Sequence, residues 1–324
     1  MASENSNKGR GVVLTAACVT MFFIRSIALY SVVSKNLLAV YPDWSGALTW
    51  AFPVFQTIMA VTGIFAGRIF VKIGPHNVAI ADAFEGARAT AKAAGVPVLV
   101  GQHRRHNPFV KKAKQIIESG ALGKLTVSSF HYMIYKNDEY FDVEWRRKKG
   151  AGPILVNLVH DIDLLRYLLG EPVAIQGMQS SAARGFETED SAVVNVRFAD
   201  GSLASMTISD ATASPWNWEA CAREDPQYRP FDADAYFIGG TKGALSLPCL
   251  QVMSYDGASS WHKPLKMDVP AVDPALPHKM QLKHFVRVVR GEEAPVVTPA
   301  DNFKTLRTLN AVKRAAETGE LVKL

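Results

Sequence analysis

The chain has 324 residues, of which 48% are hydrophobic and 20% are charged, with 23 glycines and 17 prolines. This composition excludes a disordered, collagen-like or low-complexity chain, and the length allows about two domains. Three cysteines, Cys18, Cys221 and Cys249, are too few and too scattered for a disulfide scaffold or a zinc site. The net charge is +6, and residues 1–76 alone hold six basic and two acidic side chains. The excess charge is therefore local, and we expect no nucleic-acid partner.

Two apolar stretches, residues 11–33 and 47–70, each contain a single charged residue. Each is long enough to cross ~30 Å of hydrocarbon as a helix of about 20 residues. A secretory signal peptide would have a shorter apolar core and a cleavage site after it, whereas here a second apolar stretch follows. The pattern predicts a transmembrane two-helix hairpin, with two buried helices of a soluble protein as the alternative. The flanking basic residues indicate that both termini, and the main domain, are cytoplasmic.

The remainder of the chain mixes helical and strand patterns. Helices are predicted over 78–95, 108–119, 154–169 (ending at Gly170), 280–290 and 299–318. Strands are predicted over 96–100, 125–135, 173–181, 191–198, 202–210, 235–239 and 244–247. Asp200-Gly201 is a typical hairpin turn between two of them. This order predicts an α+β fold, in which one large, mostly antiparallel open sheet carries helices on one side.

A first polar cluster, Gly101-Gln102-His103-Arg104-Arg105-His106-Asn107-Pro108, follows the predicted strand over 96–100 and opens a helix. Ligands bind at the carboxyl ends of strands in α/β sheets. Two arginines and two histidines at this place could hold an anionic or polyhydroxy ligand. A solvated loop is the alternative.

A second candidate is His160, which lies in the apolar helical segment 154–169. An imidazole with a pKa near 6.5 suits proton transfer at neutral pH. Asp161 or Asp163 could orient it, although adjacent residues of a helix point apart. The alternative is a hydrogen-bonded histidine of the core.

A third cluster begins at the end of the strand predicted over 202–210 and reads Ser209-Asp210-Ala211-Thr212-Ala213-Ser214-Pro215-Trp216-Asn217-Trp218-Glu219. Two tryptophans beside a carboxylate can line a sugar-binding pocket, since they offer apolar faces and one acceptor. The alternative is an aromatic plug at the edge of the sheet.

The three clusters occur in the order and spacing of a known family. The segments Gly-Gln-His-Arg-Arg-His-Asn-Pro (101–108), Gly-Pro-Ile-Leu-Val-Asn-Leu-Val-His-Asp-Ile-Asp (152–163), Ser-Pro-Trp-Asn-Trp-Glu (214–219) and Gly-Thr-Lys-Gly-Ala-Leu (240–245) resemble the Gfo/Idh/MocA oxidoreductases, over residues 78–324. The resemblance implies a Rossmann NAD(P) domain followed by an α/β domain with an open antiparallel sheet. It also implies hydride transfer at a carbinol carbon of a sugar, cyclitol or related polyol, with NAD or NADP as the cofactor.

The resemblance further implies roles for individual residues. His160 matches the proton-transferring histidine, and Val156 stands where many members have an aspartate four residues earlier. The expected substrate-binding residues are Arg104, Arg105, Asn157, Trp216, Trp218 and Glu219. The expected cofactor-binding residues are Gln102, His103 and Arg105, and no metal site is expected.

The N-terminal part departs from this family. No G-x-G-x-x-G turn is present, and Pro75-His76-Asn77 stands where the family's catalytic lysine is expected. Residues 67–75, Gly-Arg-Ile-Phe-Val-Lys-Ile-Gly-Pro, instead resemble the loop after the second helix of a major facilitator superfamily transporter. Two helices cannot build the central site of such a carrier. The sequence is thus interpreted as a junction near 75–78, with about 120 residues of the Rossmann domain missing; a fusion and a gene-model error would both explain it.

We accordingly expect three parts: a transmembrane hairpin (1–76), a remnant of a dinucleotide-binding domain (77–107), and a domain for substrate binding and oligomerisation (108–324). The predicted function is an impaired NAD(P)-dependent polyol oxidoreductase. One alternative is a non-catalytic ligand-binding or assembly domain tethered to a membrane. Another is a transporter fragment with an unrelated tail. The expected partners are a small polyhydroxy molecule, the membrane through residues 11–70, and a second copy of the chain through the sheet. Without the N-terminal segment we would expect a cytoplasmic protein.

Overall fold

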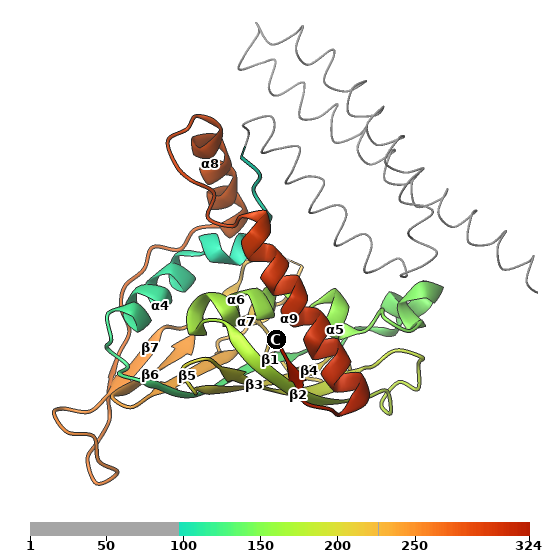
Figure 1. Ribbon diagram of the computed structural model, residues 1–324, viewed down its shortest axis with the longest axis horizontal. Coiled ribbons are helices and arrows are strands. Elements are labelled where there is room, and N and C mark those ends of the chain that lie inside the picture. Colours follow the sequence, from blue (N-terminus) through green and yellow to red (C-terminus); the bar gives the residue numbers. More distant parts are fainter. Residues whose placement is uncertain (1–96, 226) are drawn as a thin grey trace, which may run out of the picture. The chain divides into compact units, whose positions relative to one another are not determined.

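A computed structural model describes residues 97–225 and 227–324 (Figure 1). The described part is built on one nine-stranded sheet with the order β8-β7-β6-β5-β1-β4-β3-β2-β9. The strands are β1 (Leu125–Met133), β2 (Pro172–Ser180), β3 (Ser191–Phe198), β4 (Leu203–Ser209), β5 (Tyr236–Gly240), β6 (Gly243–Leu247), β7 (Gln251–Ser254), β8 (Lys266–Asp268) and β9 (Val322–Lys323). All neighbouring pairs are antiparallel except β1 and β4, which run parallel. The prediction of a large, mostly antiparallel sheet is confirmed.

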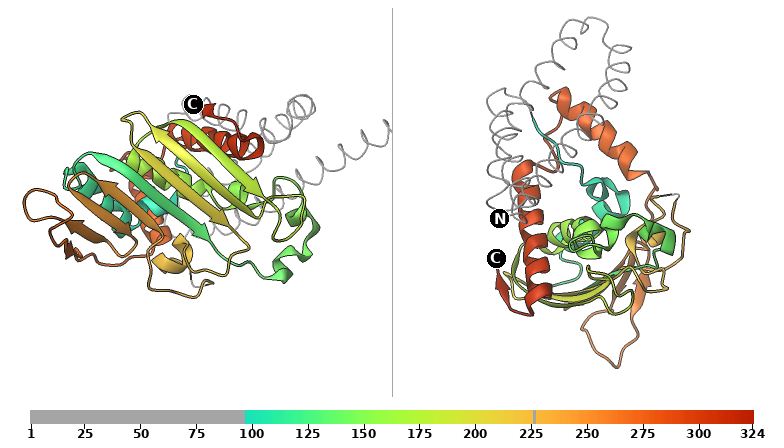
Figure 2. Two further views of the ribbon diagram at one scale, coloured as in Figure 1. Left: turned by 90° about the horizontal axis from the view of Figure 1, so that it is seen from below. Right: turned by 90° about the vertical axis from the view of Figure 1, so that its right-hand side faces the viewer.

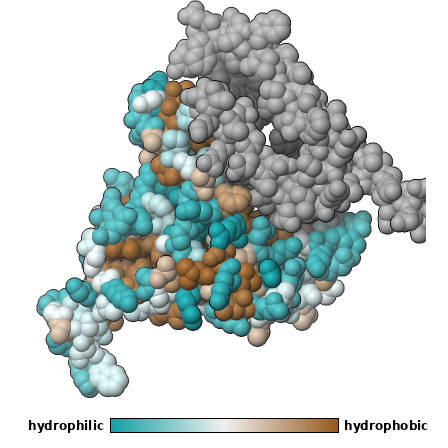
Figure 3. Space-filling view, viewed as in Figure 1, coloured by the Kyte–Doolittle hydropathy of each residue, from teal (hydrophilic) through white to brown (hydrophobic). Residues whose placement is uncertain are grey.

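The helices of the described part lie on one face of this sheet, as predicted (Figures 1 and 2). They are α4 (Pro108–Glu118), α5 (Pro153–Val156), α6 (Val159–Leu169), α7 (Trp218–Ala222), α8 (Pro277–Val289) and α9 (Pro299–Thr318), with short 3₁₀ helices η2 (His103–His106), η3 (Asp138–Asp142) and η4 (Glu144–Arg147). The described surface is mostly hydrophilic in the view of Figure 3, with apolar side chains exposed on α8.

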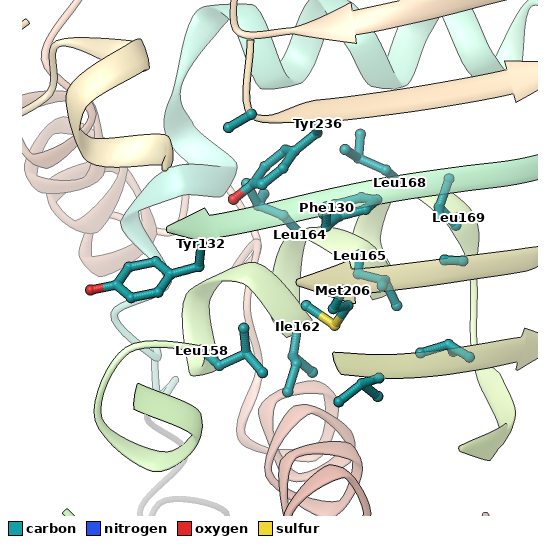
Figure 4. Close-up of a cluster of buried hydrophobic side chains, with 14 of the residues drawn as sticks. Phe130, Tyr132, Leu158, Ile162, Leu164, Leu165, Leu168, Leu169, Met206 and Tyr236 are labelled. Carbon is teal, nitrogen blue, oxygen red and sulfur yellow. The ribbon is translucent and has the colours of Figure 1, made fainter. Parts of the chain in front are cut away.

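Alternation along the strands creates the core. In β1, Phe130 and Tyr132 are buried, whereas Val127 on the opposite face is exposed. The buried side chains of β1 pack with Ile162 and Leu165 of α6 (Figure 4). Burying each such aliphatic or aromatic side chain contributes roughly 1.5–3 kcal/mol. This packing fixes the position of α6, and therefore of His160, over the sheet.

The predicted helix over 154–169 is in fact two helices. α5 ends at Val156, and α6 begins at Val159. Asn157 has φ −112° and ψ −40°, away from the ideal helix, and asparagine is a weak helix former because its side chain competes for hydrogen bonds. Gly170 ends α6 with φ +103°, in agreement with the predicted stop.

The hairpin at Asp200-Gly201 is confirmed. It joins β3 and β4, and Gly201 has φ +88°, a conformation that glycine adopts without a Cβ clash. The Asp200 Oδ1 atom accepts hydrogen bonds from the backbone N–H and the hydroxyl of Ser202, at 2.9 and 2.6 Å. The turn fixes the register of β4 against β3, and β4 pairs with β1 on its other side.

Some of the predicted elements are wrong, and others fall on residues outside the described part of the chain. Residues 97–100 of the predicted strand form no strand: Pro97 has no N–H to donate, and the Val100 N–H bonds to the Val297 carbonyl instead. The short elements α7, β7, β8 and β9 were not predicted. The helix predicted over 78–95 and the hairpin predicted over 11–33 and 47–70 lie outside the described residues. Within residues 97–225 and 227–324, no helix is long and apolar enough to cross a membrane.

Candidate active site

The parallel pair of strands brings two chain segments together. Met133 of β1 is in register with Ser209 of β4, so both strands end at the same edge of the sheet. Lys136 follows the first strand, and Asp210 follows the second, with 3.4 Å between Lys136 Nζ and Asp210 Oδ2. Such carboxyl ends are common places for ligand sites.

His160, in the first turn of α6, is held by an amide network. Its Nδ1 atom lies 2.9 Å from Oε1 of Gln102, and Nε2 of Gln102 donates to Oδ1 of Asn302 at 2.7 Å. With these amide orientations, the imidazole carries its proton on Nδ1 and donates it to Gln102. No described residue hydrogen-bonds to Nε2 of His160, so this nitrogen presents its lone pair.

The environment keeps His160 uncharged. Burial lowers the pKa of His160 to about 3, and the positive charge of Arg104 and the neighbouring imidazoles act in the same direction. The ring of His103 meets the ring of His160 edge-on, with centroids 4.9 Å apart, and stacks on His278 at 4.3 Å. At neutral pH, His160 is thus a neutral imidazole with a lone pair on Nε2, and its lowered pKa makes it a weaker base than the imidazole near 6.5 expected from the sequence.

Arg104 forms the centre of a buried polar cluster. Its guanidinium donates to Oε1 of Glu219 at 2.5 Å and to the Tyr236 hydroxyl at 3.1 Å, and it lies 3.2 Å from Oδ1 of Asp161. The Tyr236 hydroxyl also donates to Asp161. Burial raises the pKa of Asp161 to about 6, against the opposing effect of Arg104. Arg104 and Glu219 pair with each other, and each keeps one polar atom, Nε and Oε2 respectively, without a partner among the described residues; their predicted ligand roles stay predictions.

Arg105, predicted to bind both substrate and cofactor, forms ion pairs with two carboxylates of the protein, Asp163 and Asp301. Its Nε and Nη2 atoms donate to the two carboxylate oxygens of Asp163, both at 2.7 Å, and Nη1 lies 2.6 Å from Asp301. Its guanidinium also lies over the Tyr167 ring, 5.0 Å from the centroid. Arg105 therefore joins η2 to α6 and α9, and this engagement argues against the predicted ligand role.

The two tryptophans of the third cluster have different environments. Trp218 is 0% exposed and stacks on Tyr236 with a centroid distance of 5.1 Å. The prediction that it lines a ligand pocket is corrected, because a fully buried ring offers no surface to a ligand. Trp216 is 49% exposed, and its carbonyl accepts a hydrogen bond from the N–H of Met133 at the end of β1. Trp216 therefore remains available to a ligand at this edge.

Sequence reasoning missed Lys136. Its Nζ atom donates to Oδ1 of Asn157 at 2.8 Å, and burial lowers the pKa of the ammonium although Asp210 opposes this. The only sequence signal was its place directly after a predicted strand. Asn157 itself, a predicted substrate ligand, accepts this hydrogen bond at the break between α5 and α6, three residues before His160.

The described residues provide little for a dinucleotide or a metal. Of the three predicted cofactor ligands, Gln102 and Arg105 have their polar groups engaged by protein partners. His103 lies between two imidazoles, 3.6 Å from Glu224. In the described ranges, no group of three or more His, Cys, Asp or Glu side chains could hold a metal ion. Nothing in this part of the chain forms the cradle that a pyrophosphate requires.

Comparison with known proteins gives a family match for part of the chain. Residues 110–246 match the family model for the GFO/IDH/MocA C-terminal domain. This range contains His160, Lys136, Asp210 and both tryptophans of the third cluster.

Oxidoreductases are among the proteins similar to this chain. The 1,5-anhydro-D-fructose reductase of Ensifer adhaerens is 24% identical over 297 residues, covering 91% of this chain and 84% of that protein. The scyllo-inositol 2-dehydrogenase (NAD(+)) of Bacillus subtilis is 24% identical over 270 residues, 79% of this chain and 70% of that protein. The crystal structure of an aldose-aldose oxidoreductase from Caulobacter crescentus complexed with glycerol has a TM-score of 0.58 at 24% identity, covering 76% of this chain and 69% of that one. The chain is thus similar in fold to a solved oxidoreductase structure.

The extent of the first match bears on the predicted junction. A similarity that covers 91% of the chain reaches upstream of residues 75–78. Similarity to an oxidoreductase is therefore not confined to the part that carries the Gfo/Idh/MocA motifs. The transporter-like origin of residues 1–76 stays a prediction.

Proposed function

We propose that the protein is an oxidoreductase that transfers a hydride between a nicotinamide cofactor and a carbinol carbon of a polyhydroxy substrate. His160 is the group that handles the hydroxyl proton. The observation that carries the proposal is the neutral His160, whose Nδ1–H donates to Gln102 and whose Nε2 lone pair is available. Two similar proteins are named as a reductase of an anhydro sugar and a dehydrogenase of a cyclitol, and these names support a polyhydroxy substrate.

The chemistry of the chain's own residues follows from this arrangement. A bound NAD or NADP would supply or accept the hydride. In the oxidative direction, Nε2 of His160 accepts the hydroxyl proton while the carbon–hydrogen bond breaks and the carbonyl forms. Gln102 keeps the imidazole oriented throughout, because its Oε1 accepts from Nδ1 in both charge states. Lys136 and Trp216 lie where β1 ends, and Asn157 accepts a hydrogen bond from Lys136. These three side chains can bind the hydroxyls and an apolar face of the substrate.

The N-terminal sequence sets an upper limit on the rate. The chain has no G-x-G-x-x-G turn and no lysine at the position expected for the family's catalytic one. One positioned acid–base group is typically worth ~10²–10⁴ in rate, so we propose an activity at least about 10² below that of a complete enzyme of this type. This departure favours a second candidate function, a domain that binds the polyol without turnover.

Titration calorimetry and a rate assay distinguish the two functions. The purified full chain is titrated with NAD⁺ and NADP⁺, and reduction of the cofactor by scyllo-inositol is followed by absorbance. We expect a slow reaction. His160→Gln should lower its rate by a further ~10² or more, whereas the exposed control His262→Gln should leave the rate unchanged. Polyol binding without any cofactor binding would instead establish the non-catalytic function.

Two partners are also proposed. Residues 11–70 tether the protein to a membrane with the chain after residue 76 on the cytoplasmic side. Protease protection in vesicles tests this topology, and digestion of the chain after residue 76 only from the lumenal side would contradict it. The open face of the sheet joins two copies of the chain, since Val127, Val193, Leu203 and Phe237 are between 46% and 60% exposed there. Light scattering of the parent and Val193→Glu tests this contact, and an unchanged dimer or an always monomeric protein would refute it.

A further inference from the structure

A cavity of about 500 Å³ lies where α7 and the start of α4 meet the chain before α8. This volume falls within the range of about 300–1,000 Å³ that is usual for small-molecule sites. Apolar side chains form much of its wall, among them Phe109 of α4, Pro248 after β6 and Leu276 before α8. Leu276 is 58% exposed, so it marks the side on which the cavity opens to solvent. The walls can therefore hold an apolar group the size of a benzene ring.

A buried carboxylate, that of Glu224, also lines this cavity, and the residue is 8% exposed. Its Oε1 atom accepts a hydrogen bond from Asn107, whereas Oε2 lies 3.6 Å from Nε2 of His103, beyond hydrogen-bond distance. Burial raises the pKa of Glu224, but the contact with His103, the charge of Arg104 and the hydrogen bond from Asn107 lower it below its ordinary value. The carboxylate is thus charged at neutral pH, and Oε2 can accept a hydrogen bond from a ligand.

The wall of the cavity has a net negative charge. Its charged residues in the described part of the chain are Arg223, Glu224 and Asp232. Arg223 pairs with Asp232, and both side chains are exposed, so no cation of the described wall is left for Glu224. The charge of Arg104 reaches Glu224, but Arg104 already contacts two other carboxylates. The two cysteines of the wall remain uncharged thiols, because burial raises their pKa to about 11 and about 12. The cavity therefore favours a cation.

We propose that this cavity binds an organic ammonium ion, which donates to Oε2 of Glu224 and packs its apolar group against Phe109 and Leu276. An ammonium that leaves water needs a charged, hydrogen-bonded partner, and the Glu224 carboxylate provides one. A carboxylate ligand would be repelled by Glu224, and an alcohol would gain no charge-assisted bond. The site does not depend on hydride transfer at His160. It is close to that residue, however, because His103 contacts both the His160 ring, with centroids 4.9 Å apart, and Glu224.

Calorimetry with three ligands that share one ring and differ in charge tests the proposal. The full chain is titrated, without cofactor, with benzylammonium, benzyl alcohol and benzoate. We expect benzylammonium to bind at least about tenfold more tightly than benzyl alcohol, as one charge-assisted hydrogen bond provides, and benzoate to bind most weakly. The NMR signals of the His103 ring should shift with benzylammonium, since this ring contacts Glu224. Glu224→Gln should lower the affinity for benzylammonium to that for benzyl alcohol and leave the alcohol unaffected, because glutamine can still accept from Asn107.

A second variant and a control complete the test. Ala275 is an exposed residue of the cavity wall, so Ala275→Asp adds a negative charge there without disturbing the core. It should tighten benzylammonium binding by up to about fivefold, as expected for an exposed ion pair. Asp256→Asn is the matched control, because Asp256 is 82% exposed and pairs with Lys266 outside the cavity; it should change none of the affinities. Equal binding of benzylammonium and benzyl alcohol, tighter binding of benzoate, no binding of any of the three, or benzylammonium binding that Glu224→Gln leaves unchanged would overturn the proposal.

Discussion

Replacement of Arg105 by methionine tests whether this residue stabilises the fold or binds a ligand. Arg105 satisfies both oxygens of Asp163, which is 1% exposed, and it also pairs with Asp301. In Arg105→Met, the Asp163 carboxylate stays buried with the Thr305 hydroxyl, at 3.0 Å, as its remaining donor. Removing one partner of a buried ion pair costs about 3–5 kcal/mol. That is a large share of the roughly 5–15 kcal/mol by which domains are stable.

The assay is urea unfolding of the full chain, followed by tryptophan fluorescence, to which buried Trp218 contributes. We expect Arg105→Met to lower the free energy of unfolding by about 3–5 kcal/mol, and Arg105→Lys to lower it by less, because lysine keeps the charge without the paired geometry. Arg223→Met is the control: its side chain is 57% exposed and pairs with an exposed carboxylate of Asp232, so we expect a loss below about 1 kcal/mol. A stable Arg105→Met protein with weakened substrate or cofactor binding would show that the ligand role predicted from the sequence is right.

Three further predictions concern the site and its surroundings. Trp218→Ala should lower the free energy of unfolding in urea by about 3–5 kcal/mol, because it leaves a cavity where the indole packs on Tyr236; an unaltered unfolding midpoint would contradict the core position of Trp218. Gln102→Glu should raise the pKa of His160 by about one unit or more in a histidine NMR titration, since a carboxylate beside Nδ1–H favours the imidazolium; a lower pKa would refute the network. The free energy of unfolding should fall as pH drops from 6.5 to about 4, because folded His160 and His106, with pKa values of about 3 and about 4, bind fewer protons than the unfolded chain. Each contributes up to about 1.4 kcal/mol per pH unit in this range, and a stability profile that stays flat there would rule this linkage out.

Local pattern determined most of the fold. Alternating burial along 191–198, the Asp200-Gly201 turn and the proline-initiated helix over 299–318 each depend on neighbours within a few residues, so the sequence predicts them directly. The strands β7 and β8 were missed because they are set by pairing with strands outside their own segments. The position of His160 in an apolar helix could also be predicted from the sequence, because helical periodicity and the family resemblance both indicate it.

The tertiary structure decided which residues share a site. Arg104 and Arg105 are adjacent in the chain, and yet one pairs with Glu219, 115 residues away, and the other with Asp163, 58 residues away. Trp216 and Trp218 are two residues apart, and one is half exposed while the other is fully buried. The sequence shows residue types and spacing, but the direction of a side chain depends on what packs against it. Lys136 reaches Asp210 because β1 and β4 run parallel and end together, and that pairing joins segments 76 residues apart.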